Sequence, residues 1–299
     1  MRVLNFGSLN VDYVYQVDHF VRPGETLSAA SRAVKPGGKG LNQSIALARA
    51  GANVAHAGCI GAGGDALRAQ LAQEGVDTSM LLSVDEMQGH TVIQVNRDGE
   101  NCILLYGGSN QCVTGAQIAE TFAGCAAGDW LVLQNEINRL PAIVDAAFEK
   151  GMVIALNPSP CDAKLDAVDF GKLSWLLVNE VEAAQISGSD DPGAAWTWLN
   201  ARYPKLSVLI TLGGAGSVAY RVDGDAVETA RQDAFRVRAV DTTAAGDTYT
   251  GYFIAGLMAG MPLGACMRRA AKAASIAVTR PGAADSIPKL DEVTRDADA

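Results

Sequence analysis

Asp241-Thr-Thr-Ala-Ala-Gly-Asp247 is followed directly by an apolar run from Tyr249 to Met261. The small residues let the backbone turn tightly, and Asp247 then falls where a helix would begin, at the positive end of its dipole. Unpaired N–H groups at such a turn bind anionic oxygens. A carboxylate beside an anion site suggests a base next to a phosphate that is being transferred. Taken alone, the stretch also fits an ordinary helix capped by an aspartate.

The composition is that of a globular protein with a sizeable core. With 299 residues, of which 48% are hydrophobic and 19% charged, the chain has the length of one large α/β domain or of one domain with an appendage. The formal net charge of −9 argues against non-specific nucleic-acid binding, which needs a basic surface. A nucleotide substrate is still compatible with this charge, because a local loop and a metal ion can neutralise its phosphates.

Cysteine and histidine usage does not favour a zinc site. The six cysteines are scattered without a CxxC pair, and the chain has three histidines. Met1 leads directly into a strand-like segment rather than a signal-peptide pattern, and the apolar runs are too short or too interrupted to span a bilayer. We therefore expect a protein of the reducing cytoplasm, with neither a membrane nor a nucleic acid as partner.

Strand and helix patterns alternate along most of the chain. Strand patterns occur at residues 2–7, 54–60, 130–133, 153–156, 176–178 and 208–212. Helical spacing occurs at residues 42–50, 65–73, 247–259 and 263–278. This alternation predicts an α/β fold with a mostly parallel central sheet covered by helices on both faces.

Four early segments do not fit this parallel pattern. They lie near residues 11–17, 27–34, 90–96 and 101–106, and Arg97-Asp98-Gly99-Glu100 is typical of a hairpin turn between the last two. We expect them to form a small separate antiparallel sheet that acts as a lid. The predicted organisation is one domain, residues 1–299, with lid strands from about 11–35 and 88–107.

Two nucleotide-binding patterns are incomplete. Gly38-Lys39 is not a Walker A loop, because Ala33 stands where its first glycine belongs and Gly40 replaces the serine or threonine. Residues 61–66 partly match the GxGxxG pattern of dinucleotide-binding proteins, but they lie in the second βα unit of the chain and the match is weak. Helix–strand packing accounts better for these glycines, so an NAD or FAD site is not favoured.

Three other stretches agree better with the opening motif. Gly7-Ser-Leu-Asn10-Val-Asp12 ends a strand with an amide and a carboxylate on one face, which suits vicinal sugar hydroxyls, although an Asx turn gives the same pattern. Residues 37–42, GGKGLN, allow close backbone approach to a ligand at a helix start. Residues 211–216, TLGGAG, follow a strand with a small-residue loop that suits phosphates.

Two long stretches resemble the signatures of the ribokinase/phosphofructokinase-B family of carbohydrate kinases: residues 36–52, PGGKGLNQSIALARAGA, and residues 239–253, AVDTTAAGDTYTGYF. Between them, NEVE at 179–182 resembles the NxxE motif and TLGGAG the ATP loop, and residues 276–288 resemble the tail of the ribokinase branch. The resemblance covers nearly the whole chain. It implies a three-layer α/β/α sandwich with a β-sheet lid.

The resemblance also implies an activity, the ATP-dependent phosphorylation of the primary hydroxyl of D-ribose to give D-ribose 5-phosphate and ADP. Two alternatives stay open. One is a kinase of the same family that acts on another sugar, such as deoxyribose or fructose, or on a nucleoside. The other is a non-catalytic sugar-binding protein on this fold, against which the complete opening motif argues.

Residue roles follow from the same resemblance. Asp247 is the implied general base, and the N–H groups of Ala244, Ala245 and Gly246 are the implied anion hole, although many family members have glycine at position 245. The implied sugar-binding residues are Asn10, Asp12, Gly38, Lys39, Asn42 and Glu136. The implied nucleotide-binding residues are Asn179, Thr211, Gly213, Gly216 and Gly246. Where family members often carry a His or Asn against adenine, this chain has Ala271 beside Lys272.

The resemblance further implies two metal ions and a dimer. Glu182 is the acid expected to place Mg²⁺ through water, since Mg²⁺ gives up its hydration shell reluctantly. The implied activating K⁺ site consists of the Asp241 carboxylate, backbone carbonyls of four residues and a nearby hydroxyl. The carbonyls are those of Thr243, Ala277, Arg280 and Gly282, and the nearby hydroxyl is that of Ser286. A homodimer through the lid is the expected assembly.

Overall fold

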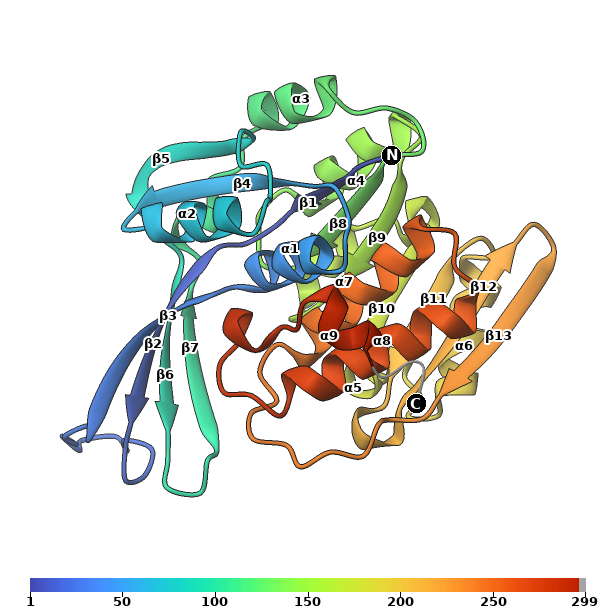
Figure 1. Cartoon of the computed structure of the whole chain (residues 1–299). Coiled ribbons are helices and arrows are strands. Elements are labelled where there is room, and N and C mark those ends of the chain that lie inside the picture. Colours follow the sequence, from blue (N-terminus) through green and yellow to red (C-terminus); the bar gives the residue numbers. More distant parts are fainter. Residues whose placement is uncertain (296–299) are drawn as a thin grey trace.

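The computed structural model describes residues 1–295 (Figure 1). Its main element is a nine-stranded sheet in the order β13-β12-β11-β10-β9-β8-β1-β4-β5, parallel from β11 to β5. The strands are β1 (Val3–Phe6), β4 (Val54–Ala62), β5 (Leu81–Met87), β8 (Trp130–Gln134), β9 (Val153–Asn157), β10 (Trp175–Asn179), β11 (Ser207–Thr211), β12 (Ser217–Asp223) and β13 (Ala226–Gln232). The predicted parallel sheet is therefore confirmed.

Helices cover both faces of this sheet. They are α1 (Lys39–Arg49), α2 (Asp65–Gln73), α3 (Gly115–Ala123), α4 (Leu140–Glu149), α5 (Glu180–Ser187), α6 (Pro192–Arg202), α7 (Ala245–Met258), α8 (Leu263–Ala277) and α9 (Leu290–Thr294). Residues alternate between two cores along each strand: in β8, Val132 packs with the helix layer of α1, α2, α7 and α8, whereas Leu131 and Leu133 pack with that of α3 to α6. The three-layer α/β/α sandwich is confirmed.

Helices α1 and α7 pack unusually closely. A Cβ atom placed on Gly251 of α7 would lie 2.4 Å from the Cβ atom of Ala46 in α1. No side chain larger than hydrogen fits between the two backbones at this crossing. Gly251 therefore sets the distance at which α1 and the N-terminal half of α7 face each other.

A second, four-stranded sheet projects from this body, at the lower left of Figure 1, in the order β3-β2-β6-β7. Its strands are β2 (Asn10–Gln16), β3 (Ser31–Gly37), β6 (His90–Val95) and β7 (Asn101–Tyr106). Strands β2 and β6 run parallel, so the sheet is mixed, and the prediction of an antiparallel sheet was wrong. The reason is that β2 and β6 both follow strands of the main sheet and leave it in the same direction, whereas β3 and β7 return.

Several boundaries differ from the sequence prediction. Strand β3 covers 31–37 rather than 27–34 and includes Pro36, which is tolerated because β3 is an edge strand and a missing N–H costs no ladder bond there. Helix α1 begins at Lys39 rather than Asn42, and α7 at Ala245 rather than Asp247. Strands β5, β12 and β13 were not predicted.

Two further observations concern the described residues. Within residues 1–295, no helix combines the length and apolarity that a membrane span requires. The six cysteines, all of which lie in this range, are free thiols.

Candidate active site

Asp247 lies in the first turn of α7, at the carboxyl ends of the central parallel strands, where ligands of open α/β sheets bind. The residue before the helix, Ala244, has φ +60°, a left-handed conformation that costs free energy for a side chain with a Cβ atom. Asp247 is 7% exposed, and its carboxylate accepts hydrogen bonds from Asn42 Nδ2 (3.0 Å) and Gln43 Nε2 (2.9 Å). Helix α1 thus holds the carboxylate on two sides.

A buried chain of amides extends behind Gln43. Gln134 Nε2 donates to Gln43 Oε1 (2.7 Å) and to Asn5 Oδ1 (3.0 Å). Because the Gln43 oxygen is an acceptor in this chain, its NH₂ group faces Asp247. The sequence prediction missed Gln43, although the polar pair Asn42-Gln43 in front of an apolar helical run was the available signal.

Lys39 lies among three carboxylates. Burial lowers the pKa of its ammonium group, but the negative charges of Asp247, Glu136 and Glu182 outweigh this and raise the pKa above its ordinary value. The Lys39 backbone N–H also donates to Glu136 Oε2 (3.1 Å), an oxygen that the Ser8 hydroxyl shares. Burial raises the pKa of Glu136, against the lowering effect of Lys39. Lys39 therefore carries the positive charge of this part of the site.

Asn10 and Asp12 lie in β2 of the smaller sheet rather than at the end of β1, which corrects their predicted position. Asn10 Oδ1 accepts from Asn110 Nδ2 (2.8 Å), and Asp12 Oδ1 accepts from Thr91 Oγ1 (2.6 Å). Burial raises the pKa of Asp12, opposed by the Thr91 hydrogen bond and the Lys35 charge. Asn110 was not predicted, because it lies in a short helical turn, Gly108–Gln111, that follows the smaller sheet and carries no motif.

Gly38 and Gly40 bring the start of α1 against this corner. Gly38 has φ +94°, and a Cβ atom on Gly40 would lie 2.3 Å from the backbone N of Ser8. The structure thus brings the predicted sugar residues, Gly38, Lys39, Asn42 and Glu136 from the body and Asn10 and Asp12 from the smaller sheet, toward one corner in front of Asp247.

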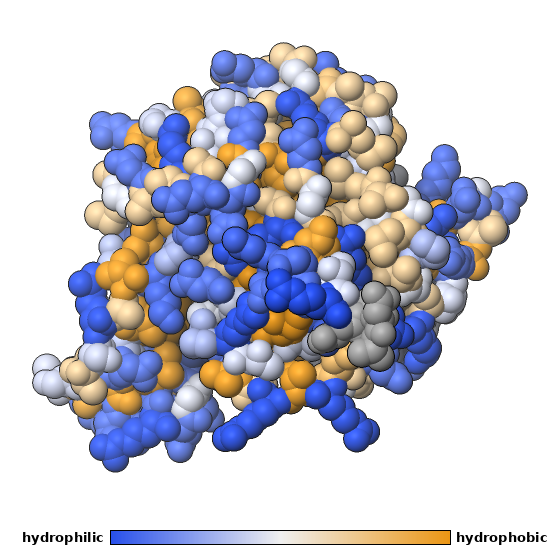
Figure 2. Space-filling model, in the orientation of Figure 1, coloured by the Kyte–Doolittle hydropathy of each residue, from blue (hydrophilic) through white to orange (hydrophobic). Residues whose placement is uncertain are grey.

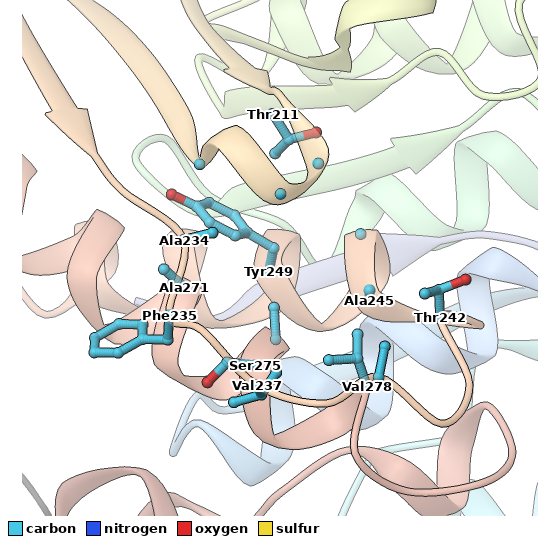
Figure 3. A pocket seen from close by; sticks show the side chains of 16 residues that line it. Thr211, Ala234, Phe235, Val237, Thr242, Ala245, Tyr249, Ala271, Ser275 and Val278 are labelled. Carbon is cyan, nitrogen blue, oxygen red and sulfur yellow. The ribbon is translucent and has the colours of Figure 1, made fainter.

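Two hollows meet at the start of α7. Both are lined by Thr211, Thr242, Ala245 and Gly246. The first, of about 370 Å³, is mostly apolar and extends to Phe235 and α8 (Figure 3). The second, of about 250 Å³, is polar, and Asp247, Lys39, Asn179 and Glu182 line it. The two form a groove that leads from an apolar end to the carboxylate of Asp247.

The predicted nucleotide residues divide between these hollows. Gly213 and Gly216 line the apolar one, as does Ala271, whereas Asn179 lines the polar one. Lys272 places its ammonium group over the Phe235 ring, 5.5 Å from the ring centre.

Residues 2–290 match the family model described as pfkB family carbohydrate kinase. The chain belongs to this family. It is a phosphotransferase that acts on an alcohol group. The kinase is 35% identical to a ribokinase of Haemophilus influenzae, over 96% of this chain and 95% of that one. It is 33% identical to a ribokinase of Staphylococcus aureus, over 98% and 99%.

Solved structures agree with this assignment. The kinase matches the crystal structure of a ribokinase from Cryptococcus neoformans in complex with ADP, with a TM-score of 0.83 and 33% identity over 98% of this chain and 99% of that one. It matches an Arabidopsis thaliana ribokinase complexed with ribose and ATP with a TM-score of 0.84 and 27% identity, over 98% and 97%.

In the kinase, Asn179 and Glu182 form a reciprocal cap on α5. Asn179 Oδ1 accepts from the Glu182 N–H (2.8 Å), and Glu182 Oε2 accepts from the Asn179 N–H (3.1 Å). Residues 1–295 contain no group of three or more His, Cys, Asp or Glu side chains placed to hold a metal ion. The Glu182 carboxylate, which lines the polar hollow together with Asp247, still fits Mg²⁺, which is usually bound by one or two carboxylates, substrate phosphates and water.

Asp241 joins two segments of the predicted K⁺ site. Its Oδ1 accepts from the Thr243 N–H (2.9 Å) and Oγ1 (2.6 Å), and its Oδ2 accepts from the Gly282 N–H (2.9 Å). Burial alone would raise the pKa of Asp241, but these hydrogen bonds lower it below its usual range. Two predicted ligand groups already have partners: Ala277 O accepts from the Arg280 N–H (3.0 Å), and Ser286 Oγ donates to Ala283 O (2.8 Å).

Proposed function

We propose that this kinase transfers the γ-phosphoryl group of ATP to the primary hydroxyl of D-ribose, giving D-ribose 5-phosphate and ADP. One observation carries the proposal: the buried carboxylate of Asp247 stands where the polar corner and the nucleotide-sized groove meet. The similarity to ribokinases supports ribose as acceptor, and a relative complexed with ribose and ATP supports the donor.

Asp247 is the proposed general base. It accepts the proton of the attacking hydroxyl, a step that comes late in a loose transition state, so positioning supplies most of the rate enhancement. The N–H groups of Ala244, just before α7, and of Ala245 and Gly246 in its first turn are the proposed donors to the transferring phosphoryl group. The Ala245 N–H contacts Thr242 O at 3.3 Å, a long hydrogen bond that an anion can replace.

Asn42 supplies a direct argument for a polar substrate at this corner. Its Nδ2 is engaged with Asp247, whereas its Oδ1 is buried and has no hydrogen-bond partner within residues 1–295. A buried, unpaired acceptor costs about 1–3 kcal/mol. A sugar hydroxyl that donates to this oxygen removes the cost, so we propose that Asn42 orients the acceptor while also holding the base.

The metal sites are part of the proposal. Glu182, through water, would hold Mg²⁺, whose charge offsets that of the ATP phosphates. The Asp241 loop, with the carbonyls of Thr243, Arg280 and Gly282, would hold K⁺, which fixes the turn before α7. Replacing K⁺ by Na⁺ or Tris in the kinase assay tests the proposed K⁺ site. An unchanged rate would refute the proposal that K⁺ activates the kinase there.

We also propose a homodimer through the four-stranded sheet. Strand β7 exposes a run of apolar side chains, among which Leu104 is 71% exposed, and Figure 2 shows apolar surface over this region. Apolar patches of this kind mark contact surfaces. Light scattering measures the molecular mass of the wild-type kinase and of Leu104→Glu. A wild-type mass equal to that of one chain, which the substitution leaves unchanged, would contradict the dimer. The cytoplasmic location stays a prediction from the sequence.

A substrate panel tests the acceptor. Phosphorylation of ribose, deoxyribose, fructose and adenosine is measured with ATP, Mg²⁺ and K⁺, and ribose is expected to have the highest kcat/KM. Deoxyribose is the main competitor, since a deoxyribokinase of Salmonella typhi is 27% identical over 98% of this chain. Faster turnover of any other acceptor would refute ribose as the substrate, and no turnover of all four would favour a binding protein.

A further inference from the structure

The lining of the apolar hollow beside α7 has few groups that could form hydrogen bonds with a nucleotide base. No charged side chain lines it within residues 1–295. Its wall consists largely of glycine, alanine and valine, together with the rings of Phe235 and Tyr249 (Figure 3). A planar aromatic base fits such a wall by its faces rather than by its edge.

The hydroxyl groups of this lining are largely engaged inside the protein. Tyr249 OH is hydrogen-bonded to Ser217 Oγ (2.8 Å), and Ser275 Oγ donates to Lys272 O (2.7 Å). Thr211 Oγ1 lies within hydrogen-bond distance of Val178 O (3.4 Å). The remaining hydroxyl, that of Thr242, lies where the apolar hollow joins the polar one, at the phosphate end rather than the base end.

Helix α8 contributes only short side chains to the base end. Ala271 and Ser275 are one helical turn apart and therefore share a face, with Ala274 beside them. The sequence resemblance implies a His or Asn against adenine in this region, where the kinase has Ala271. One backbone pair nearby is also engaged, since the Val240 N–H donates to Val278 O (2.7 Å).

We infer that the kinase accepts nucleoside triphosphates with different bases as phosphoryl donors, with weak preference among the purines. This inference rests on the proposed function of the groove as a nucleotide site. A site built to hydrogen-bond a substrate rejects analogues by roughly 10⁴–10⁵-fold, whereas an apolar pocket separates similar groups by about 10–200-fold. Because no side chain of the hollow is placed to hydrogen-bond the edge of the base, we expect the discrimination between ATP and GTP or ITP to be about 200-fold or less.

The first experiment measures nucleotide binding without sugar. ADP, GDP, IDP and CDP displace a fluorescent ADP analogue, labelled on the ribose, from the full-length kinase. The dissociation constants of the three purine nucleotides are expected to agree within about tenfold. A constant for GDP or IDP more than about 10³-fold above that of ADP would overturn the inference, and so would no binding of any nucleotide.

Two variants sharpen the result. Phe235→Ala removes one of the two aromatic rings of the lining, the one whose side chain makes no hydrogen bond, and is expected to weaken all the nucleotides by a common factor, about fivefold or more, since stacking is tolerant of base identity. Phe148→Ala, which truncates a half-exposed ring that does not line this hollow, is the control and is expected to leave binding unchanged. A loss confined to ADP in Phe235→Ala would contradict weak base preference.

The rates with ribose separate this inference from the proposed function. If ribose is phosphorylated by ATP but GTP and ITP are more than about 10³-fold slower donors, the function stands and the inference fails. If ribose is not an acceptor while the purine nucleotides bind alike, the inference stands and the ribose assignment fails.

Discussion

Gln43→Met tests whether the kinase depends on the amide that holds its proposed base. The substitution keeps the length of the side chain but removes the 2.9 Å hydrogen bond to Asp247 Oδ1 and the acceptor of Gln134 Nε2. A hydrogen bond to a charged group contributes about 1.5–3 kcal/mol. If this bond is needed to hold the carboxylate in the transition state, its loss lowers kcat by about 10- to 150-fold.

The KM for ribose should change little, because the Gln43 amide contacts Asp247, Gln134 and Asn157 rather than the open corner. Steady-state kinetics with ATP and ribose separate kcat from KM, and thermal unfolding measures the stability lost with the unpaired Gln134 donor. Gln117→Met is the matched control, since Gln117 is a buried glutamine that bonds to Gly58 O (2.7 Å) away from the groove.

The control should lose stability but keep kcat. A kcat for Gln43→Met within twofold of the wild-type value, or an equal loss of kcat in both variants, would refute the positioning role. In the first case the Asn42 hydrogen bond alone would be sufficient to hold Asp247.

Two further predictions concern stability. Burial lowers the pKa of His56 to about 4. As the pH falls below 6.5, the unfolded chain therefore binds a proton that the folded chain excludes. The free energy of unfolding is highest above that pH, and about 2 kcal/mol of it is lost between pH 7 and pH 5. Urea unfolding at both pH values should show this loss, and His56→Gln should reduce it; an equal loss in the variant would contradict it. Gly251→Ala forces α1 and α7 apart and is expected to cost about 1–3 kcal/mol and most activity. Gly264→Ala, at an open helical position, should be neutral or stabilising; similar costs for both would contradict the packing argument.

Much of the main body could be predicted because its signals are local. Buried strands read as short apolar runs, and the residues at their carboxyl ends, such as Glu136, Asn179 and Thr211, come together as the parallel sheet requires. The kinase signatures at α1 and α7 then identify the corner, and the structure brings Asn42 within 3.0 Å of Asp247. These features follow from the topology of the sheet, and the hydrophobic periodicity of the sequence predicts that topology.

The smaller sheet could not be predicted as well, since its strand directions depend on connections far apart in sequence. Strand β6 pairs in parallel with β2, from which more than seventy residues separate it. The predicted strand stopped at residue 34, short of Pro36, because an edge position, where proline is harmless, has no local signature. The β12–β13 hairpin at the other edge was missed although Asp223-Gly224-Asp225 is a turn signal between alternating segments.

Positioning contacts were the least predictable part of the site. Asn110, which holds Asn10, and Gln134, which orients Gln43, are neutral amides in segments that the family motifs do not include. Their roles depend on tertiary distances between elements 90 residues or more apart. No propensity or spacing rule identifies such a pair before the fold is known.

The central claim is that Asp247 is the base of a sugar kinase, and Asp247→Asn tests it most directly. The amide keeps the size of the side chain but cannot accept the hydroxyl proton, and general-base catalysis contributes about 10²–10⁴-fold. We predict that kcat for ribose falls by about 10³-fold while the dissociation constant for ribose, measured by calorimetry, stays within about threefold. A variant that retains kcat within tenfold of the wild-type value would contradict the account.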